Sequence, residues 1–298
     1  MSIEELKGTA LAKHTITLQT ITPLLMHGAN PREMAESRET SFKGVIRYWW
    51  RVLQLNSSEL LQEETRLFGG AGGREDGVSS PLRLRVSELK GQRSYAIRPH
   101  RGPSAGRTKG IDEGSTIELR MAVLRKDVDL LKFYKNLLEF AFSVGAFGQR
   151  ARRGYGSLQI EDIKWATVED YLSYLENLVF ALTDLSFADL KIVSDVEHPF
   201  IRNLWVGEPC QTSKEALIKI GQASSDATAS AGNVGYLLGS IGSRYSKRLA
   251  SPLHASVRKI GADFYPIVVE TRGKQQVFED YRNQRSVFLE KLGVNLNE

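Results

Sequence analysis

Residues 127–165 of the chain read DVDLLKFYKNLLEFAFSVGAFGQRARRGYGSLQIEDIKW. Apolar residues recur at helical spacing from Asp127 to Val144, which predicts an amphipathic helix. Residues 157–165 alternate apolar and polar side chains, which predicts a strand. Between them lie residues 145–157, which hold four glycines, three arginines and two aromatic residues; we call this segment the glycine-arginine loop. Its composition favours a polyanionic ligand, because glycine admits close approach and arginine carries a forked donor that fits phosphate.

The residues before this stretch predict the rest of one sheet. Strands are expected at 14–20, 82–86 and 116–124, and helices at 41–55, capped by Thr40 or Ser41, and at 58–68. The basic segment 89–115, which is rich in glycine and proline, predicts a long, partly mobile loop. The order strand, helix, strand, strand, helix, strand is that of the ferredoxin-like unit, which RNA-recognition domains also use.

The second half of the chain predicts a further unit of helices and strands. Helices are expected at 168–182, 213–221 and 274–292, and a hairpin of strands at 253–260 and 264–270. We therefore expect an α+β fold of two ferredoxin-like (RRM-like) domains. Residues 1–166 would form the first, with its glycine-rich loop, and residues 167–298 a second, degenerate copy.

Composition indicates a cytoplasmic protein with a basic surface. The net charge is +5, and the cations cluster: residues 89–111 contain six lysines and arginines and no acid. Such clustering favours nucleic acid as a partner. The single cysteine, Cys210, excludes an intramolecular disulfide and a multi-cysteine zinc site. Because the N-terminus lacks a signal-peptide pattern and no apolar run reaches ~20 residues, no membrane partner is expected.

The helix expected at 41–55 carries a basic stripe. Lys43, Arg47 and Arg51 recur every four residues and so share one face, without an acid between them. A helix N-terminus also favours anions, so the stripe predicts phosphate contacts. Beside it runs an apolar stripe of Phe42, Ile46, Trp49 and Leu53, in which Trp49 is expected to be a core residue.

The glycine-arginine loop supplies the second group of candidate ligands. Arg150, Arg152 and Arg153 are expected to contact phosphates, and Phe147 and Tyr155 are candidates for base stacking. No Gly-Lys-Ser/Thr follows, and the loop precedes a strand rather than opening a helix. These facts exclude the Walker A motif and the Rossmann fingerprint, and favour an extended nucleic acid backbone over a mononucleotide.

The sequence contains no convincing active site. No pair of its five histidines shows metal-ligand spacing, so neither a metal nor another cofactor is expected. His27, in a loop after the first strand, is the candidate general acid or base. Glu33, Glu36 and Glu39 read as ordinary solvated acids. We therefore expect a protein that is not an enzyme.

Several segments resemble the RAMP superfamily of CRISPR–Cas systems. The helix sequence KGVIRYWWR at 43–51 is similar to that of the first-named subunit family of the type III-B (Cmr) effector complex. Lys43 stands where members often have arginine, and Val144-Gly145 where a glycine pair is common. The segments are Thr22–Ala29, Arg38–Arg51, Phe68–Gly70, Phe147–Ser157, Leu204–Gly207 and Arg248–His254.

The resemblance implies a non-catalytic subunit of an RNA-guided effector complex in antiviral defence. It implies two ferredoxin-like domains that bind single-stranded RNA, guide or target, near the 3′ end of the guide, and other RAMP subunits as neighbours. With the basic patterns described above, it gives a set of candidate RNA-binding residues. They are Arg38, Lys43, Arg47, Arg51, Phe147, Arg150, Arg152, Arg153, Tyr155, Arg244, Lys247 and Arg248.

Two other functions remain open on the sequence. One is a metal-independent RAMP endoribonuclease that processes guide RNA with His27 as general acid or base. The other is a protein-interaction scaffold whose basic surface binds acidic partner subunits. Loss of cleavage on replacing His27 would favour the first, and complexes that survive nuclease and high salt would favour the second.

Overall fold

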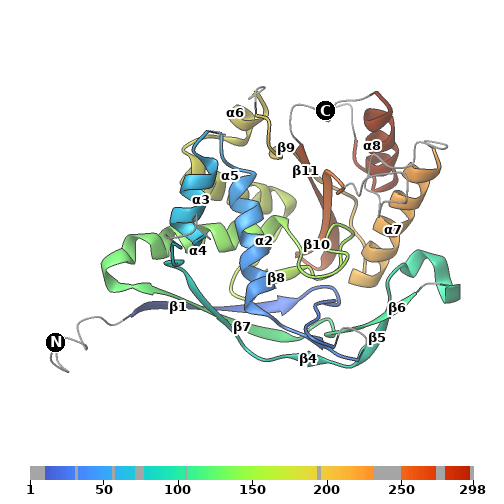
Figure 1. Ribbon diagram of the computed structural model, residues 1–298. Helices are drawn as coiled ribbons and strands as arrows, with labels where there is room; N and C mark the ends of the chain where they lie inside the picture. Colours follow the sequence, from blue (N-terminus) through green and yellow to red (C-terminus); the bar gives the residue numbers. More distant parts are fainter. Residues whose placement is uncertain are drawn as a thin grey trace.

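The computed structural model describes residues 11–30, 33–55, 58–70, 77–104, 106–192, 196–230, 250–272 and 279–295 (Figure 1). Its first sheet has four antiparallel strands in the order β3-β7-β1-β8. The longest strand pair is β1 with β7, and its side chains alternate between the two faces of the sheet. In β7, Ile117, Leu119, Met121 and Val123 point to the core and the residues between them do not. The strands are β1 (Leu11–Thr20), β3 (Arg83–Val86), β7 (Thr116–Leu124) and β8 (Leu158–Ile160).

Helices cover one face of this sheet. Helix α2 (Glu39–Arg51), helix α3 (Leu60–Phe68) and helix α4 (Val128–Val144) enclose the main core with it; a short 3₁₀ turn, η2 (Arg125–Asp127), leads into α4. Trp49 is 1% exposed, which confirms it as a core residue. The cap assignment at Thr40 or Ser41 is wrong: α2 begins at Glu39, and its N-cap, Arg38, makes no side-chain capping bond.

The segment expected to be a mobile loop is folded. Strand β4 (Lys90–Gly91) pairs with β2 (Ala35–Glu36), and β5 (Arg93–Ala96) pairs with β6 (Arg107–Gly110). A 3₁₀ helix, η1 (Pro99–Ser104), lies between β5 and β6. The Tyr95 hydroxyl stabilises the hairpin by donating to Asp112, and Gly91 of β4 packs so closely on the backbone of Gly110 that a Cβ would not fit. The prediction from composition was therefore wrong.

The second sheet has the order β10-β11-β9. The predicted hairpin is confirmed as β10 (Leu253–Ile260) and β11 (Asp263–Arg272), which turn at Gly261 with φ of 58°. Strand β9 (Phe200–Val206) and helix α6 (Phe187–Ile192) were not predicted. The other helices are α5 (Val168–Thr183), α7 (Ser213–Ala229) and α8 (Glu279–Lys291), and α7 runs eight residues beyond its predicted end at 221.

The two halves share contacts at the base of the glycine-arginine loop. The main core cluster extends from β1 and β7 to Ile260, Ile267 and Val269 of the second sheet. Arg258 of β10 is fully buried and donates from Nε to the carbonyl oxygen of Ser143 at 2.7 Å, and from Nη2 to that of Gly145. These bonds join β10 to the end of α4, where the loop starts.

The architecture is a mixture of helices and antiparallel sheets, so the α+β class is confirmed. Within the described ranges, no helix is both long and apolar enough to span a bilayer.

Candidate nucleic-acid interface

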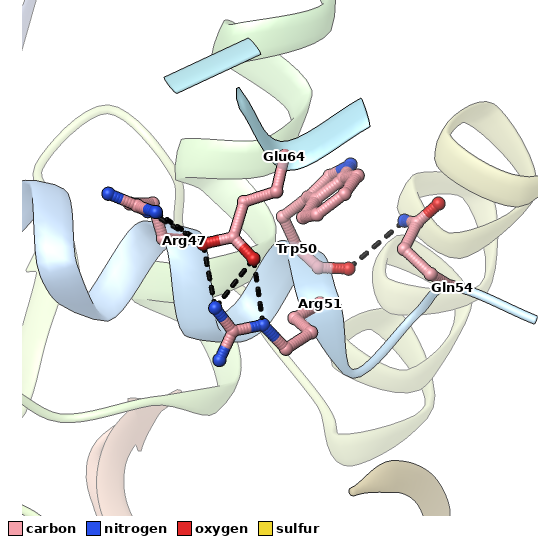
Figure 2. Close-up of polar contacts among 5 residues, drawn as sticks. All are labelled: Arg47, Trp50, Arg51, Gln54 and Glu64. Carbon is pink, nitrogen blue, oxygen red and sulfur yellow. Dashed lines mark hydrogen bonds and ion pairs between the residues drawn. The ribbon is translucent and has the colours of Figure 1, made fainter. Parts of the chain in front are cut away.

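The basic stripe of α2 is organised by an acid that lies outside the helix. Glu64 of α3 is 2% exposed and accepts bonds from Arg47 and Arg51 (Figure 2). Arg47 donates from Nε at 2.9 Å and from Nη2 at 2.5 Å, both to Oε1. Arg51 donates from Nε to Oε2 at 2.9 Å and from Nη2 to Oε1 at 2.7 Å. The basic stripe lacks an acid only within the sequence of α2. In the fold, Glu64 of α3 lies between Arg47 and Arg51.

This arrangement, which we call the Glu64 clamp, favours the charged form of Glu64. Burial alone would raise the pKa of Glu64, but hydrogen bonds from Arg51 and Arg47 and their charges outweigh burial and lower it. The clamp therefore carries a net charge of +1. The two arginine side chains are still 36% and 40% exposed, and their bonds to Glu64 use Nε and Nη2. The clamp therefore fixes the arginines while their side chains stay partly exposed.

The other two candidates at α2 lie at its beginning. The Lys43 ammonium donates to the carbonyl oxygen of Leu82 at 3.4 Å, and burial, followed by the charge of Arg47, lowers its pKa. The Arg38 guanidinium is exposed and donates to the carbonyl oxygen of His27 at 3.3 Å. Lys43 is thus within electrostatic reach of Arg47, whereas Arg38, the N-cap residue, lies at the other end of α2 from Arg51.

The glycines of the glycine-arginine loop serve packing within the protein. Gly148 and Gly156 have φ of 81° and 67°, and a Cβ on Gly156 would collide with the carbonyl of Phe147. The loop amides also bond internally: Gln149 N donates to Leu25 O at 2.6 Å, and Gly154 N donates to Ala255 O at 2.9 Å. The expectation that the glycines expose amides to a ligand is wrong at Gly154 and Gly156, because their amides donate to Ala255 O and Pro23 O.

The loop arginines divide between two directions. Arg152 lies over the ring of Tyr48, 5.7 Å from its centroid, and donates to the carbonyl oxygen of Ser251. Arg153 donates to the carbonyl oxygen of Arg152 at 2.9 Å, and burial, followed by the charges of Arg150 and Arg152, lowers its pKa to about 10. Arg150 interacts with Tyr155 and Arg98 instead. Arg152 thus contacts α2, whereas Arg150 is within electrostatic reach of Arg98, which precedes η1.

The two aromatic residues of the loop are core residues. Phe147 is 0% exposed and stacks on Phe42 with ring centroids 5.1 Å apart. Tyr155 is 4% exposed, and its hydroxyl donates to the carbonyl oxygen of Ala96. Because no face of either ring is open to an RNA base, their assignment as stacking residues is wrong.

Tyr48 connects the clamp to the loop. Its hydroxyl lies 2.8 Å from His254 Nε2 and 2.6 Å from Thr271 Oγ1, and its ring stacks on the imidazole of His254. Tyr48 is within electrostatic reach of both Arg51 and Arg152. Electrostatic reach links Lys43 to Arg47, Tyr48 to Arg51 and Arg152, and Arg153 to Arg152 and Arg150. We call this set of cations the basic track: Lys43, Arg47, Arg51, Arg152, Arg153 and Arg150.

The remaining sequence candidates lie elsewhere. Arg244, Lys247 and Arg248 fall outside the described residues. His27 Nε2 lies 3.0 Å from the carbonyl oxygen of Lys109 and 3.2 Å from Thr108 Oγ1, so it is engaged by strand β6. In the described part of the chain, no group of three or more His, Cys, Asp or Glu side chains is placed to hold a metal.

Sequence reasoning missed Glu64 and Tyr48. Glu64 lies in the acidic run Glu63-Glu64 of a predicted helix, and no spacing within that helix marks it as a partner of α2. Tyr48 lies between the basic and apolar stripes of α2, so a helical projection did not assign it to either one. Only the packing of α3 and β11 on α2 reveals their contacts.

Comparisons with known proteins identify relatives of this chain. Residues 17–159 match the model of the RAMP superfamily. The CRISPR system Cmr subunit Cmr1-2 of Pyrococcus furiosus is 26% identical over 180 residues, which cover 49% of this chain and 94% of that protein.

Two solved structures share the fold. The crystal structure of apo Cmr1 from Pyrococcus furiosus matches with a TM-score of 0.63 at 16% identity, covering 95% of this chain and 98% of that one. A chain of the cryo-EM structure of the type III-B Cmr-beta complex bound to cognate target RNA matches with a TM-score of 0.60 at 14% identity, with the same coverages. The resemblance to the RAMP superfamily is therefore confirmed, and the chain carries a region of that superfamily at residues 17–159.

Proposed function

We propose that this chain is a non-catalytic, RNA-binding subunit of a type III-B RNA-guided effector complex. The observation that carries the proposal is the Glu64 clamp: a buried carboxylate holds Arg47 and Arg51 in place while their side chains stay 36% and 40% exposed. The relatives support it, since one is a Cmr subunit and another belongs to a Cmr complex bound to target RNA. Other RAMP subunits would be its neighbours, and the 3′ region of the guide its contact.

The clamp suits a phosphate backbone better than a base edge. Each guanidinium donates from Nε and Nη2 to Glu64, so its Nη1 can donate to another acceptor. The arginines thus bind with their rotamers already fixed, which reduces the entropy lost on association. Arg152 and Arg153 continue the charge beyond Tyr48, so consecutive phosphates of a single strand can follow the basic track.

The proposal assigns a structural role to His27. Its Nε2 faces a carbonyl oxygen, Lys109 O, and therefore carries the proton as a donor to β6. That nitrogen cannot take a proton from a ribose hydroxyl while the bond lasts. The bond leaves only Nδ1 of His27 for acid–base chemistry, and we favour binding over cleavage of RNA by this chain.

We also propose that the two sheets are two ferredoxin-like units, divided near residue 166. The first sheet has its strands in the order last, first, third and second along the chain, with α2 and α4 as the two crossovers. The second unit, β9-α7-β10-β11-α8, repeats this connection as far as its second helix. The glycine-arginine loop would then join the last helix and strand of the first unit.

Salt dependence of RNA binding tests the proposal. For single-stranded RNA, the log–log slope of affinity against salt should fall by about 0.7 for each phosphate contact removed. Arg47→Ala leaves Glu64 paired with Arg51, so the fold should persist while the slope drops by about 0.7. The matched control is Arg120→Ala, which removes a 68% exposed cation from the outer face of β7.

Equal slopes for the two variants would refute the assignment of the clamp. If the protein alone cleaves repeat RNA, the endoribonuclease function replaces the proposed non-catalytic one. Complexes with partner subunits that survive nuclease and high salt, without any RNA affinity, would favour the scaffold.

A further inference from the structure

A second cluster of cations lies beyond the glycine-arginine loop, where η1 packs against α7 (Figure 1). His100 of η1 sits over Gly221 of α7, and a Cβ on that glycine would collide with the Nδ1 of His100. Arg98 precedes η1, and Arg150 reaches this region from the loop. The absence of a side chain at Gly221 thus lets the imidazole lie close to the helix.

These three side chains have no acceptor within the described residues. The Nε atoms of Arg98 and Arg150 and the Nδ1 of His100 are buried and make no hydrogen bond. No ion pair neutralises either guanidinium among the residues that the structure describes. This differs from the Glu64 clamp, where every inner donor has its carboxylate oxygen.

The surroundings make the cluster more positive still. His100 lies within electrostatic reach of Arg101, Arg150 and Arg98. Asp226 of α7 is the acid that acts on it, and that carboxylate already pairs with Lys291 at 3.3 Å. The Tyr155 hydroxyl, which faces Arg150, donates to the carbonyl oxygen of Ala96 and so offers no charge.

Such a cluster is unfavourable in the free protein. Burial, and then the neighbouring cations, lowers the pKa of His100, and burial lowers that of Arg150. Arg150 also has φ of 64°, a left-handed conformation that non-glycine residues adopt at a cost. Partly dehydrated cations gain more from an anion than hydrated ones do, because less water must be displaced on binding.

We propose that Arg98, His100 and Arg150 form a phosphate site that holds a backbone phosphodiester of bound RNA. This inference rests on the proposed function, and it extends the basic track from Arg153 and Arg150 to the face of α7. A phosphate suits the cluster because two guanidiniums and one imidazole within electrostatic reach of each other can offer it N–H donors. Arg98 and His100 become RNA-contacting residues that were not among the twelve candidates named from the sequence, although Arg98 belongs to the basic segment 89–111.

Two measurements on the full chain test this site. In the first, Arg98→Ala should weaken binding of single-stranded RNA about fivefold or more and reduce the salt slope by about 0.7. The matched control is Arg107→Ala, which removes an exposed arginine bonded to Ser94 on the same hairpin and should change affinity less than about twofold. Arg98→Ala should not lower the melting temperature, since it removes a repelling charge.

In the second measurement, inorganic phosphate is titrated while the imidazole NMR signals of His100 are followed, with a His100→Gln protein to assign them. A saturable shift that disappears in Arg98→Ala supports the site. If Arg47→Ala weakens RNA binding but Arg98→Ala does not, and phosphate leaves His100 unchanged, the site is refuted while the proposed function stands. If phosphate shifts His100 but the wild-type protein binds no RNA, the ligand is free phosphate and both the RNA assignment and the proposed function fail.

Discussion

Replacing Glu64 by glutamine separates the charge of the basic track from its geometry. The substitution is nearly isosteric and raises the net charge of the chain from +5 to +6. If RNA affinity depended on charge alone, Glu64→Gln would bind more tightly. If the clamp positions Arg47 and Arg51, the same change should weaken binding, because both guanidiniums lose the carboxylate that holds them.

The structure sets the magnitude of the expected effects. Removing one partner of a buried ion pair costs about 3–5 kcal/mol. The two arginines are 36% and 40% exposed and can regain water, so we expect a stability loss nearer to about 2 kcal/mol. At about 2 °C per kcal/mol for a chain of this length, the melting temperature should fall by about 4 °C.

RNA binding should also weaken, by about half as much free energy as the loss in stability. Each freed arginine must be immobilised again on binding, at about 0.5–1.5 kcal/mol per side chain. The added charge returns less than about 1 kcal/mol in water and salt. The net loss of about 1 kcal/mol corresponds to a fivefold lower affinity for single-stranded RNA, measured by fluorescence anisotropy at fixed salt.

Glu63→Gln is the matched control for this experiment. Glu63 lies next to Glu64 on α3, is 44% exposed, and pairs with Arg66 rather than with α2. It adds the same charge, so RNA affinity should stay equal or rise slightly. The positioning role of Glu64 is refuted if the two glutamine variants bind RNA equally well.

Two further predictions concern the loop and its surroundings. Gly156→Ala combines a positive φ with a collision against Phe147 and should destabilise the protein by about 3 kcal/mol, whereas Gly114→Ala, with φ of 78° and open space, should cost about 1 kcal/mol in urea unfolding. Equal losses would show that the loop relaxes. Burial, then Arg152 and Arg153, holds the pKa of His254 well below its usual value, so the unfolded chain binds the proton more readily. Neutral His254 contributes fully to the free energy of unfolding above its unfolded pKa of about 6.5. This stabilisation is lost as pH falls below that value, by about 1.4 kcal/mol at one pH unit lower. His254→Gln should therefore show a smaller drop in melting temperature between about pH 7.5 and 5.5 than the wild type, and an unchanged drop would contradict this.

The sequence by itself determined the elements whose signals are local. Alternation located β1 and β7, helical spacing located α4 and placed Trp49 in the core, and the hairpin of β10 and β11 followed from two runs around Gly261. These succeed because each pattern reflects which face of one segment is buried. The clusters of lysine and arginine in α2 and in the loop could also be read from the sequence, since they depend only on residue type and spacing.

Only the tertiary structure decided what those residues contact. Glu64 comes from another helix, so the stripe that looked unpaired holds a buried carboxylate between Arg47 and Arg51. Phe147 and Tyr155, aromatic residues in a cationic loop, turned out to be core because the loop folds onto residues 22–26 and β10. Strands formed at Lys90–Gly91, Arg93–Ala96 and Arg107–Gly110 through partners that include β2. Arg98 and His100 are within electrostatic reach of Arg150 in the region where η1 packs on α7. Ion pairs, hydrogen bonds and burial depend on distances in space, and residues far apart in the chain reach those distances only when it has folded.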